Sequence, residues 1–338
     1  MTNLQTTYLG LSLAHPIVAG ASPLSATLDG MRRLEDAGAA AIVTRSFFEE
    51  EVTAEEEALD FTRTIGAESH PEVTSYLPAL SGFRWPQVAR IETVRRAAEG
   101  LSVPVIASMS ATTGERWVEL ASALQEAGAA ALELNLFDVP TDPQKTSSAV
   151  EERLVEVVKN VCGTVSVPVA VKLGPYFSAP VHLARLFADA GAGGIVLFNR
   201  FYEPDIDLQK MAFRPTLALS TKDDVRRPLR WIALLSGRTP LGLAASGGVE
   251  AADEVVKYLL AGADVVQTAS ALLRHGPQHL HQLVNGLAEW LGAHDAVSVT
   301  DIRGRMSAQR MSWPEELMCG QPKRRLLMEF PCQDSAAG

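Results

Sequence analysis

The chain has 338 residues, of which 47% are hydrophobic and 21% charged, and it carries a formal net charge of −10. This composition is typical of a globular metabolic protein, and the acidic balance argues against a nucleic-acid-binding surface. No apolar run approaches the roughly 20 residues of a transmembrane helix, and three scattered cysteines are too few for a disulfide framework or a metal site. We therefore expect a cytoplasmic protein with no membrane, nucleic-acid or metal partner.

One local pattern recurs four times along the chain, at residues 36–44, 126–134, 189–198 and 260–268. Each copy has an Ala-Gly-Ala sequence suited to a left-handed helix end, followed at once by an apolar run suited to a buried strand. Predicted strands of a second kind alternate with these copies, and each begins at a proline. Proline lacks a backbone N–H, but the first residue of a strand does not need this donor for sheet pairing. The alternation predicts eight strands, near Ile17, Ile42, Val105, Leu132, Val169, Ile195, Leu241 and Val265.

Eight strands separated by amphipathic segments predict the α/β class and, within it, a (β/α)8 TIM barrel. The predicted helices are Leu28–Asp36, Val88–Ala98, Trp117–Glu126, Val150–Val161, Val181–Asp189, Val225–Leu235 and Val255–Leu260. An open doubly wound sheet is the structural alternative. It does not explain why strands that begin at a proline alternate four times with strands that follow an Ala-Gly-Ala sequence.

The barrel is predicted to span residues 1–292, with unequal loops at the strand ends where such barrels carry their active sites. A long loop follows the second strand at about 46–86, and an insertion follows the sixth strand at 198–220. A C-terminal arm, residues 293–338, is predicted to pack on the barrel or on a partner subunit. The sequence is therefore compatible with a homodimer.

Two neighbouring turns near the end of the predicted barrel suit a phosphate group. Gly247 and Gly248 follow the seventh strand, and Thr268, Ala269 and Ser270 follow the eighth. Each turn opens a helix, where unpaired backbone N–H groups and the positive end of the helix dipole attract an anion. Neither turn is specific alone, but α/β barrels commonly bind phosphate between the loops after strands seven and eight.

Polar side chains end several other predicted strands of an otherwise apolar barrel. Lys172, in VAVKL, is the most informative, because a buried ammonium must find a negative or hydrogen-bonding partner or lose its proton. A structural ion pair with Glu133 would satisfy it, and so would a flavin whose reduced ring carries negative charge. Asn135 and Asn199 would then hold a planar, hydrogen-bonding substrate against the flavin ring.

At these residues the chain resembles the FMN-dependent dihydroorotate dehydrogenases, most closely their dihydroorotate dehydrogenase-like branch, over about residues 3–290. The resemblance is carried by PIVAGASP, VTRS, LELN, AVKLGPYF, VLFNRFYEPDID, ASGGV and AGADVVQTASALL. It implies one FMN in each barrel. The cofactor-binding residues that it implies are Ala19, Gly20, Ser46, Asn135, Lys172, Gly247, Gly248, Thr268, Ala269 and Ser270.

The chain departs from the family pattern on the substrate side. Arg45 stands where the family has the lysine of Thr-Lys-Ser, which keeps the charge but changes its geometry. Asp138 stands where the family has the Cys or Ser that removes the substrate's C5 proton, and Pro140 replaces an asparagine that binds orotate. A carboxylate is a weaker base than a thiolate unless burial raises its pKa. The resemblance assigns Asp138, as the base, together with Asn135, Asn199 and Arg45 to the catalytic set.

The predicted function is that of an FMN-dependent oxidoreductase that transfers a hydride from a ring CH–CH group to flavin N5. Dihydroorotate, oxidised to orotate in pyrimidine biosynthesis, is the substrate that the resemblance implies. Two alternatives stay open: a related flavoenzyme that acts on another planar substrate, and a non-redox barrel that binds a phosphorylated metabolite. The sequence does not identify the electron acceptor.

Overall fold

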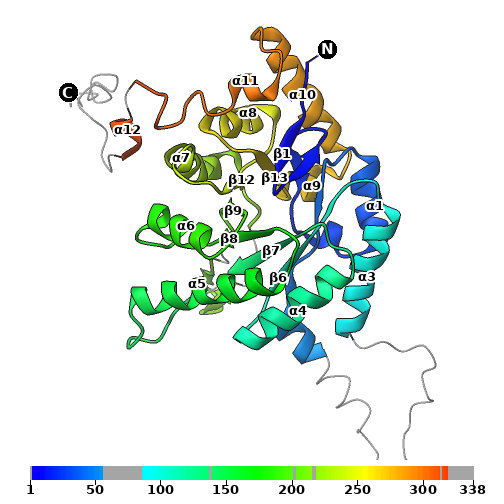
Figure 1. Ribbon diagram of the computed structural model, residues 1–338, viewed down its shortest axis with the longest axis vertical. Helices are drawn as coiled ribbons and strands as arrows, with labels where there is room; N and C mark the ends of the chain where they lie inside the picture. Colours follow the sequence, from blue (N-terminus) through cyan, green and yellow to red (C-terminus); the bar gives the residue numbers. More distant parts are fainter. Residues whose placement is uncertain are drawn as a thin grey trace, which may run out of the picture.

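The computed structural model describes residues 2–55, 86–136, 139–200, 203–214, 218–312 and 314–318. Its centre is a barrel of eight parallel strands ringed by helices (Figure 1). In chain order these strands are β3 (Ile17–Ala19), β4 (Ile42–Val43), β6 (Val105–Ser110), β7 (Ala131–Leu136), β8 (Val169–Leu173), β9 (Gly194–Leu197), β12 (Gly242–Ser246) and β13 (Val265–Thr268). The barrel closes because β4 pairs with both β3 and β6. The predicted fold class and the eight predicted strands are confirmed.

Helices alternate with the strands and cover the outside of the barrel. They are α1 (Leu28–Asp36), α3 (Pro86–Gly100), α4 (Gly114–Glu126), α5 (Ser147–Thr164), α6 (Pro180–Asp189), α7 (Arg226–Leu235), α8 (Ala252–Ala261), α9 (Ser270–His275) and α10 (His279–Ala293). The predicted helices are confirmed, and α1 agrees with its prediction at both ends. Thr27, Thr113 and Thr146 each cap a helix by accepting a backbone N–H of its first turn, which satisfies a donor that the helix leaves open.

The four repeated Ala-Gly-Ala sequences end helices, as the pattern predicts. Their glycines, Gly38, Gly128, Gly191 and Gly262, have φ angles from +83° to +119°. Residues with a Cβ rarely adopt this region, whereas glycine does so at little cost. Each glycine is followed within a few residues by a barrel strand, so the repeat marks the point where the chain turns from the outer helices into the sheet.

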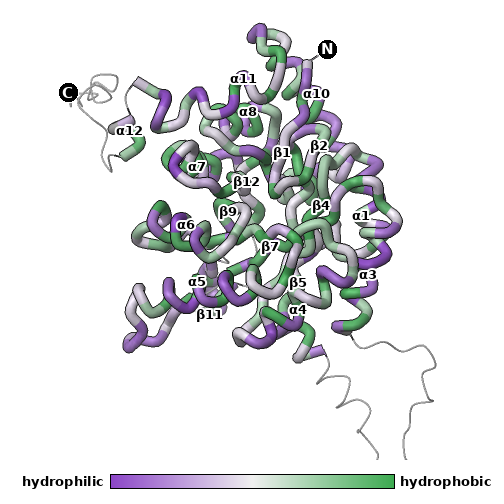
Figure 2. Tube along the Cα trace, viewed as in Figure 1, coloured by the Kyte–Doolittle hydropathy of each residue, from purple (hydrophilic) through white to green (hydrophobic). Residues whose placement is uncertain are grey.

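Small apolar residues line the barrel interior, and Tyr8 closes its amino end. Tyr8 belongs to a hairpin of β1 (Thr6–Tyr8) and β2 (Leu11–Leu13). A Cβ on Gly194 would lie 3.1 Å from Tyr8 Oη, and a Cβ on Gly242 would lie 3.1 Å from the Tyr8 ring. The two glycines therefore make room for the phenol where β9 and β12 begin. Figure 2 shows the hydrophobic residues running along the strands, while the helices alternate in colour.

The chain after β4 departs from a simple barrel strand. Residues 44–46 leave the sheet, and β5 (Phe47–Phe48) rejoins it by pairing with β6, where Phe47 lies opposite Met109. Residues 49–55 are helical. The remainder of the predicted long loop, 56–85, lies outside the described residues.

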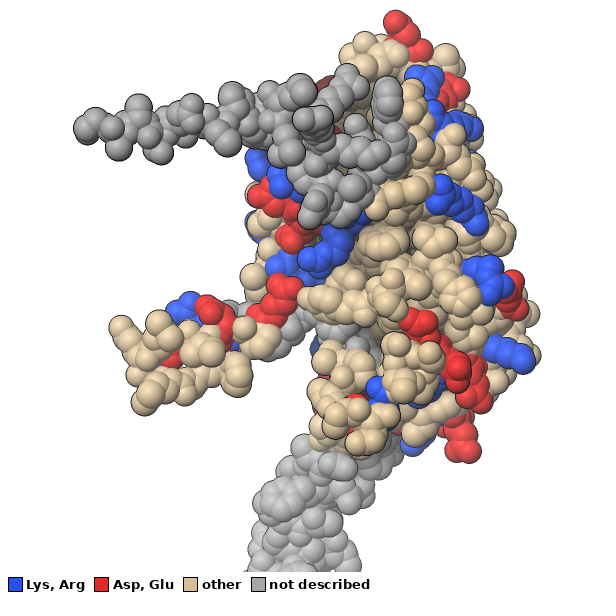
Figure 3. All heavy atoms as spheres, turned by 90° about the vertical axis from the view of Figure 1, so that its left-hand side faces the viewer, with Lys and Arg blue, Asp and Glu red and all other residues tan. Residues whose placement is uncertain are grey.

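The predicted insertion after the sixth strand contains a two-stranded ribbon. Its strands, β10 (Asp205–Asp207) and β11 (Ala212–Arg214), pair antiparallel. The ribbon stands away from the barrel, at the left of Figure 3. Its apolar side chains Ile206, Leu208, Met211 and Phe213 are 55 to 89% exposed. The chain returns to α7 through the short helix η2 (Lys222–Val225).

The described part of the C-terminal arm packs on the barrel. Asn3 N donates to Val297 O at 2.8 Å, and Gly304 N donates to Leu259 O at the end of α8 at 2.9 Å. The arm contains the short helices α11 (Val299–Ile302) and α12 (Glu315–Met318). The domain boundary at 292 and the packing on a partner subunit stay predictions, and residues 319–338 lie outside the described range.

Within the described residues, no helix is long and apolar enough to cross a membrane. The same residues contain no group of three His, Cys, Asp or Glu side chains placed to hold a metal ion. Cys162 is a free thiol whose pKa burial raises to about 11, so it is mostly protonated at neutral pH and a poor nucleophile. The cytoplasmic location stays a prediction.

His15 ties the entry of β3 to the end of α1. Its Nδ1 accepts a hydrogen bond from Ile17 N at 3.2 Å, so Nε2, which lies 2.8 Å from Gly38 O, carries the proton. A neutral ring makes both bonds, whereas a protonated ring would lose the first. Burial lowers the pKa of His15, and the bond to Gly38 raises it in part.

We therefore predict that His15 makes the fold less stable as the pH falls below about 6.5, the ordinary pKa of histidine. Below that pH the unfolded chain binds a proton at His15, whereas the folded protein binds it only at the lower pKa of the buried ring. The free energy of unfolding therefore decreases as the pH decreases. His15→Gln, which cannot titrate, should be less stable than the parent by about 1 kcal/mol near pH 8, and the gap should narrow toward about pH 5. Thermal unfolding across this range measures the gap, and a constant gap would contradict the assignment.

Candidate active site

A cavity of about 120 Å³ lies at the carboxyl ends of β3, β8, β9, β12 and β13. Of the predicted cofactor-binding residues, it is lined by Gly20, Lys172, Gly247, Gly248, Thr268, Ala269 and Ser270. A second cavity of about 300 Å³ shares Asn199, Arg200 and Gly247 with the first and extends toward α7. Parallel barrels carry their chemistry at this end of the strands.

The two predicted phosphate-binding turns lie side by side on this cavity. Ser220, at the end of the insertion, joins them: its Oγ accepts a hydrogen bond from Gly248 N at 3.2 Å and donates to Ser270 Oγ at 2.9 Å. Tyr258 Oη, from α8, donates to Gly247 O at 2.7 Å. The turn after β12 and the turn after β13 are therefore held as one unit.

The two glycines of the first turn have different surroundings. Both have positive φ, +106° at Gly247 and +73° at Gly248. A Cβ on Gly247 would meet nothing within 4 Å, so the backbone there faces open space in the cavity. A Cβ on Gly248 would lie 2.7 Å from Val225 N and 2.9 Å from Thr221 O. Gly247 thus leaves room for a ligand, and Gly248 allows the close approach of η2.

Lys172 lines the same cavity and is paired with a carboxylate inside the barrel. Its Nζ lies 3.1 Å from Glu133 Oε1 and 3.3 Å from Gln267 Oε1. Gln267 Nε2 donates to Glu133 Oε2 at 2.6 Å, so the three side chains form a closed ring of hydrogen bonds. The ion pair with Glu133 that the sequence suggested is present, and it leaves Lys172 at the wall of the cavity.

Asn135 and Asn199 are joined at the ends of β7 and β9. Asn199 Nδ2 donates to Asn135 Oδ1 at 2.8 Å. Asn135 is only 3% exposed and lies opposite Lys172 in the sheet. The structure therefore brings the two predicted substrate-binding amides together, next to the ammonium.

Arg45 and Ser46 lie at the end of β4 and do not line the cavity around Lys172. Ser46 Oγ is 2.8 Å from Ser108 Oγ, and both side chains are buried. The exposed guanidinium of Arg45 is bound by both carboxylate oxygens of Glu51, at 2.8 and 3.0 Å. Arg90 shares that carboxylate at 3.4 Å. Arg45 is thus engaged by a neighbouring acidic residue.

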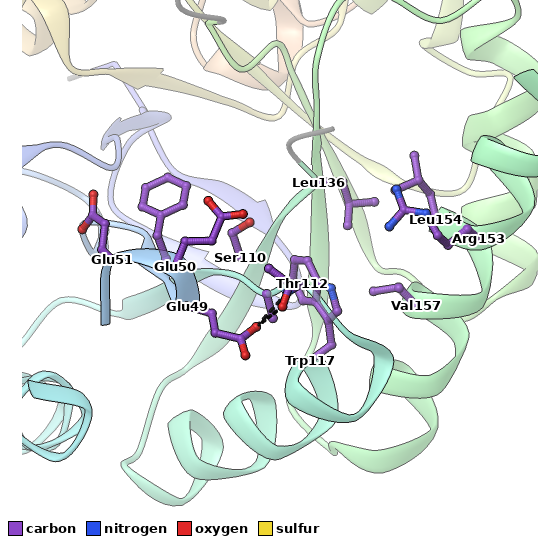
Figure 4. Close-up of a pocket in the computed structure, with 12 residues that line it drawn as sticks. Glu49, Glu50, Glu51, Ser110, Thr112, Trp117, Leu136, Arg153, Leu154 and Val157 are labelled. Carbon is purple, nitrogen blue, oxygen red and sulfur yellow. Dashed lines mark hydrogen bonds between the residues drawn. The ribbon is translucent and has the colours of Figure 1, made fainter. Parts of the chain in front are cut away.

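A third cavity, of about 420 Å³, lies between the acidic run 49–51, α4 and α5 (Figure 4). The acidic run lines one side and Arg153 the other, with Leu136, the last residue of β7, between them. Glu49 Oε2 accepts hydrogen bonds from Thr112 N and Oγ1 at 2.8 and 2.7 Å. The acidic run is therefore fixed to the barrel and places negative charge beside the end of β7.

Some residues of the site follow from the sequence and others do not. Ala19 lies in β3 opposite Thr268, and Asp138 lies outside the described residues.

The sequence analysis missed Gln267 and Ser220. Gln267 could have been found, because a lone amide in the buried strand VVQT needs partners for the same reason as Lys172 does. Ser220 ends an irregular insertion and offers no local signal.

The family model described as dihydroorotate dehydrogenase matches residues 85–291. The chain belongs to the dihydroorotate dehydrogenase family. A putative dihydroorotate dehydrogenase A (fumarate) of Aeropyrum pernix is 34% identical over 240 residues, 67% of this chain and 74% of the relative. The catalytic subunit of dihydroorotate dehydrogenase B (NAD(+)) of Shouchella clausii is 30% identical over 210 residues, 60% and 68% of the two chains. The corresponding catalytic subunit of Thermoplasma acidophilum is 25% identical over 319 residues, which are 90% of this chain and 99% of the relative.

As a member of this family, the chain is an oxidoreductase of the dihydroorotate dehydrogenase type, which acts on CH–CH groups in pyrimidine biosynthesis. Dihydroorotate dehydrogenases are generally FMN-dependent. The matched region contains the lining of the cavity around Lys172 except for Gly20 and Ala21, at the end of β3. The family match removes the support for a non-redox barrel.

We predict that two glycines of this cavity differ in their tolerance of a side chain. Gly248→Ala should lower the free energy of unfolding by about 2 kcal/mol, because its Cβ would press on fixed backbone at a positive φ. Gly20→Ala should cost less than about 1 kcal/mol, because its Cβ would lie at least 3.4 Å from its neighbours. Chemical unfolding of both variants measures the difference. Equal losses would contradict the close approach of η2 to Gly248.

Proposed function

We propose that the chain binds one FMN in the cavity at the strand ends and oxidises a planar ring substrate beside it. The backbone N–H groups at Gly247 and at Thr268–Ser270 would hold the phosphate, and Gly248, whose N–H donates to Ser220 Oγ, would shape the turn. Gly20 and Lys172 line the same cavity and would also hold the cofactor, and the roles of Ala19, Ser46 and Asn135 stay predictions. One observation carries the proposal: paired anion-binding turns, open backbone at Gly247 and a buried ammonium meet in a single cavity. This donor set suits a ligand with a phosphate at one end and an anionic ring at the other.

The chemistry divides between the cofactor and the side chains of the site. When bound, FMN supplies an acceptor for the hydride of a ring C–H. Asn135 and Asn199, already fixed to each other, would offer the amide donors and acceptors that orient a planar substrate. Lys172 would keep a positive charge beside the ring, and Asp138 would accept the proton that the substrate loses.

We propose dihydroorotate as the substrate and orotate as the product. The amide pair of Asn135 and Asn199 suits a ring that carries both carbonyl and N–H groups. A related planar substrate is the second candidate, favoured by Asp138 in place of Cys or Ser and by the bond between Arg45 and Glu51. The names of two relatives contain fumarate and NAD(+), so we propose these two compounds as the first electron acceptors to test.

Flavin content and anaerobic bleaching test the cofactor and the substrate separately. The purified protein should be yellow, with one FMN for each chain, and dihydroorotate should bleach it in the absence of oxygen. Colourless protein that stays colourless after incubation with FMN would overturn the cofactor assignment. Yellow protein that dihydroorotate leaves oxidised would overturn the substrate, and other planar CH–CH compounds would then be screened in the same way.

Ala269 offers a test of the phosphate site by charge alone. It lines the cavity with a φ of −135°, which accepts a side chain. Ala269→Glu should abolish FMN retention, because a carboxylate there would repel the phosphate. In Ala269→Gln the new side chain has nearly the same size as glutamate but no charge, so this variant should bind FMN at least about tenfold more tightly than Ala269→Glu. The difference in affinity between the two variants should be smaller at high salt. Titration of FMN fluorescence measures both affinities, and equal weakening would point to a steric effect and remove the phosphate from this turn.

Asp138, the proposed base, can be tested by pH and by removal of its charge. A base acts only when ionised, so flavin reduction by the true substrate should accelerate with pH through one apparent pKa. Asp138→Asn should slow reduction by about 10²- to 10⁴-fold, while substrate binding changes far less. Asp142→Asn, the same substitution four residues further along the chain, serves as the control. Stopped-flow rates that match the parent at every pH would exclude Asp138 from the chemistry.

A further inference from the structure

The ring formed by Glu133, Lys172 and Gln267 lies inside the barrel, away from water. These side chains come from β7, β8 and β13 and are 0%, 7% and 2% exposed. Charges in such a place are screened much less than charges at the surface. The charge of Glu133 therefore acts on anything that binds in the cavity above it.

Both oxygens of Glu133 are occupied within the ring. Oε1 faces the ammonium of Lys172, and Oε2 accepts from the amide of Gln267. Gln267 also presents its carbonyl oxygen to Lys172, so its amide is oriented by two partners of opposite character. Two donors, one of them charged, therefore occupy both oxygens of Glu133.

Lys172 retains the capacity to meet a ligand. An ammonium has three N–H donors, and the described part of the chain provides acceptors for two of them, on Glu133 and Gln267. Because Lys172 also lines the cavity, the third donor is available there. A ligand at this point meets an ion pair with a net charge of zero, and not an isolated cation.

Among the described residues, no second cation is paired with Glu133. Ser108, which lies opposite Glu133 in the sheet, is bonded to Ser46. Tyr8 Oη is buried and has no hydrogen-bond partner among the described residues. Burial, and then the charges of Glu133 and Asp264, hold the pKa of Tyr8 well above its ordinary value. The phenol is therefore neutral, and Lys172 is the cation that balances Glu133.

We propose that Glu133 is a positioning residue that sets the reduction potential of the bound flavin by opposing the charge of Lys172. The inference rests on the proposed binding of FMN. Reduced FMN carries more negative charge than oxidised FMN, so an unopposed ammonium would favour the reduced form. Glu133 limits that preference, which lets the flavin pass its electrons on to an acceptor, and Gln267 keeps the two charged groups in place.

Glu133→Gln, which is isosteric, tests the proposal on flavin-loaded protein reduced alongside a dye of known potential. The affinity for reduced FMN relative to oxidised FMN should rise at least tenfold, which is about 30 mV for a two-electron couple. Lys172→Met should shift the ratio the other way. The double variant restores a net charge of zero and should return to within about threefold of the parent. Glu35→Gln is the control, because Glu35 bonds Ser102 at the amino end of the barrel, and it should leave the potential unchanged.

Flavin-loaded Glu133→Gln with the parent's potential would overturn the proposal. Removal of one partner from a buried ion pair can prevent folding. If Glu133→Gln does not fold, Lys172→Met is compared with the double variant, because these two proteins also differ only at position 133. The affinity for reduced FMN relative to oxidised FMN must then be at least tenfold higher in the double variant than in Lys172→Met. A parent that binds no FMN would refute the proposed function and this inference with it. Equal potentials in flavin-loaded proteins would overturn the role of Glu133 alone.

Discussion

A buried ammonium needs a buried carboxylate, and this barrel is built to hold the two together. Lys172 and Glu133 would each be costly in the interior without the other, and Gln267 completes their hydrogen bonds. Long polar side chains fit inside because neighbouring interior positions are small, among them Ala170 and Ala244. The small residues of the barrel wall are therefore part of what shapes the candidate active site.

The rest of the site is ordered along the barrel axis around this pair. At the amino end, Tyr8 fills the space that Gly194 and Gly242 leave, and so closes the interior from that side. Toward the carboxyl end, Asn135 follows Glu133 by two residues on β7, and successive alternate residues of a strand share a face. The amide of Asn135, which we propose to bind substrate, thus stands one step above the ion pair, opposite Lys172 in the sheet.

Most of the fold could be predicted because its signals are local. A helix ends at a glycine such as Gly38 and an apolar strand follows directly, so the repeat shows both elements without knowledge of their neighbours. The same holds for a polar residue at a strand end, such as Lys172. The bond from Ser220 to Ser270 could not be predicted, since it joins residues 50 apart and Ser220 ends an irregular insertion. The contacts of Arg45 likewise depend on how the chain folds back after β5.

The two ends of the site differ in how far they keep the family pattern. The proposed phosphate end retains its paired turns, whereas the proposed substrate end carries Arg45 in place of lysine. The guanidinium of Arg45 is already engaged by a carboxylate, because its Nη2 contacts both oxygens of Glu51. A substrate with its own carboxylate, such as dihydroorotate, would have to compete with Glu51 for this cation. A neutral planar ring would not, so the proposed role of Arg45 in the catalytic set would bear on the choice of substrate.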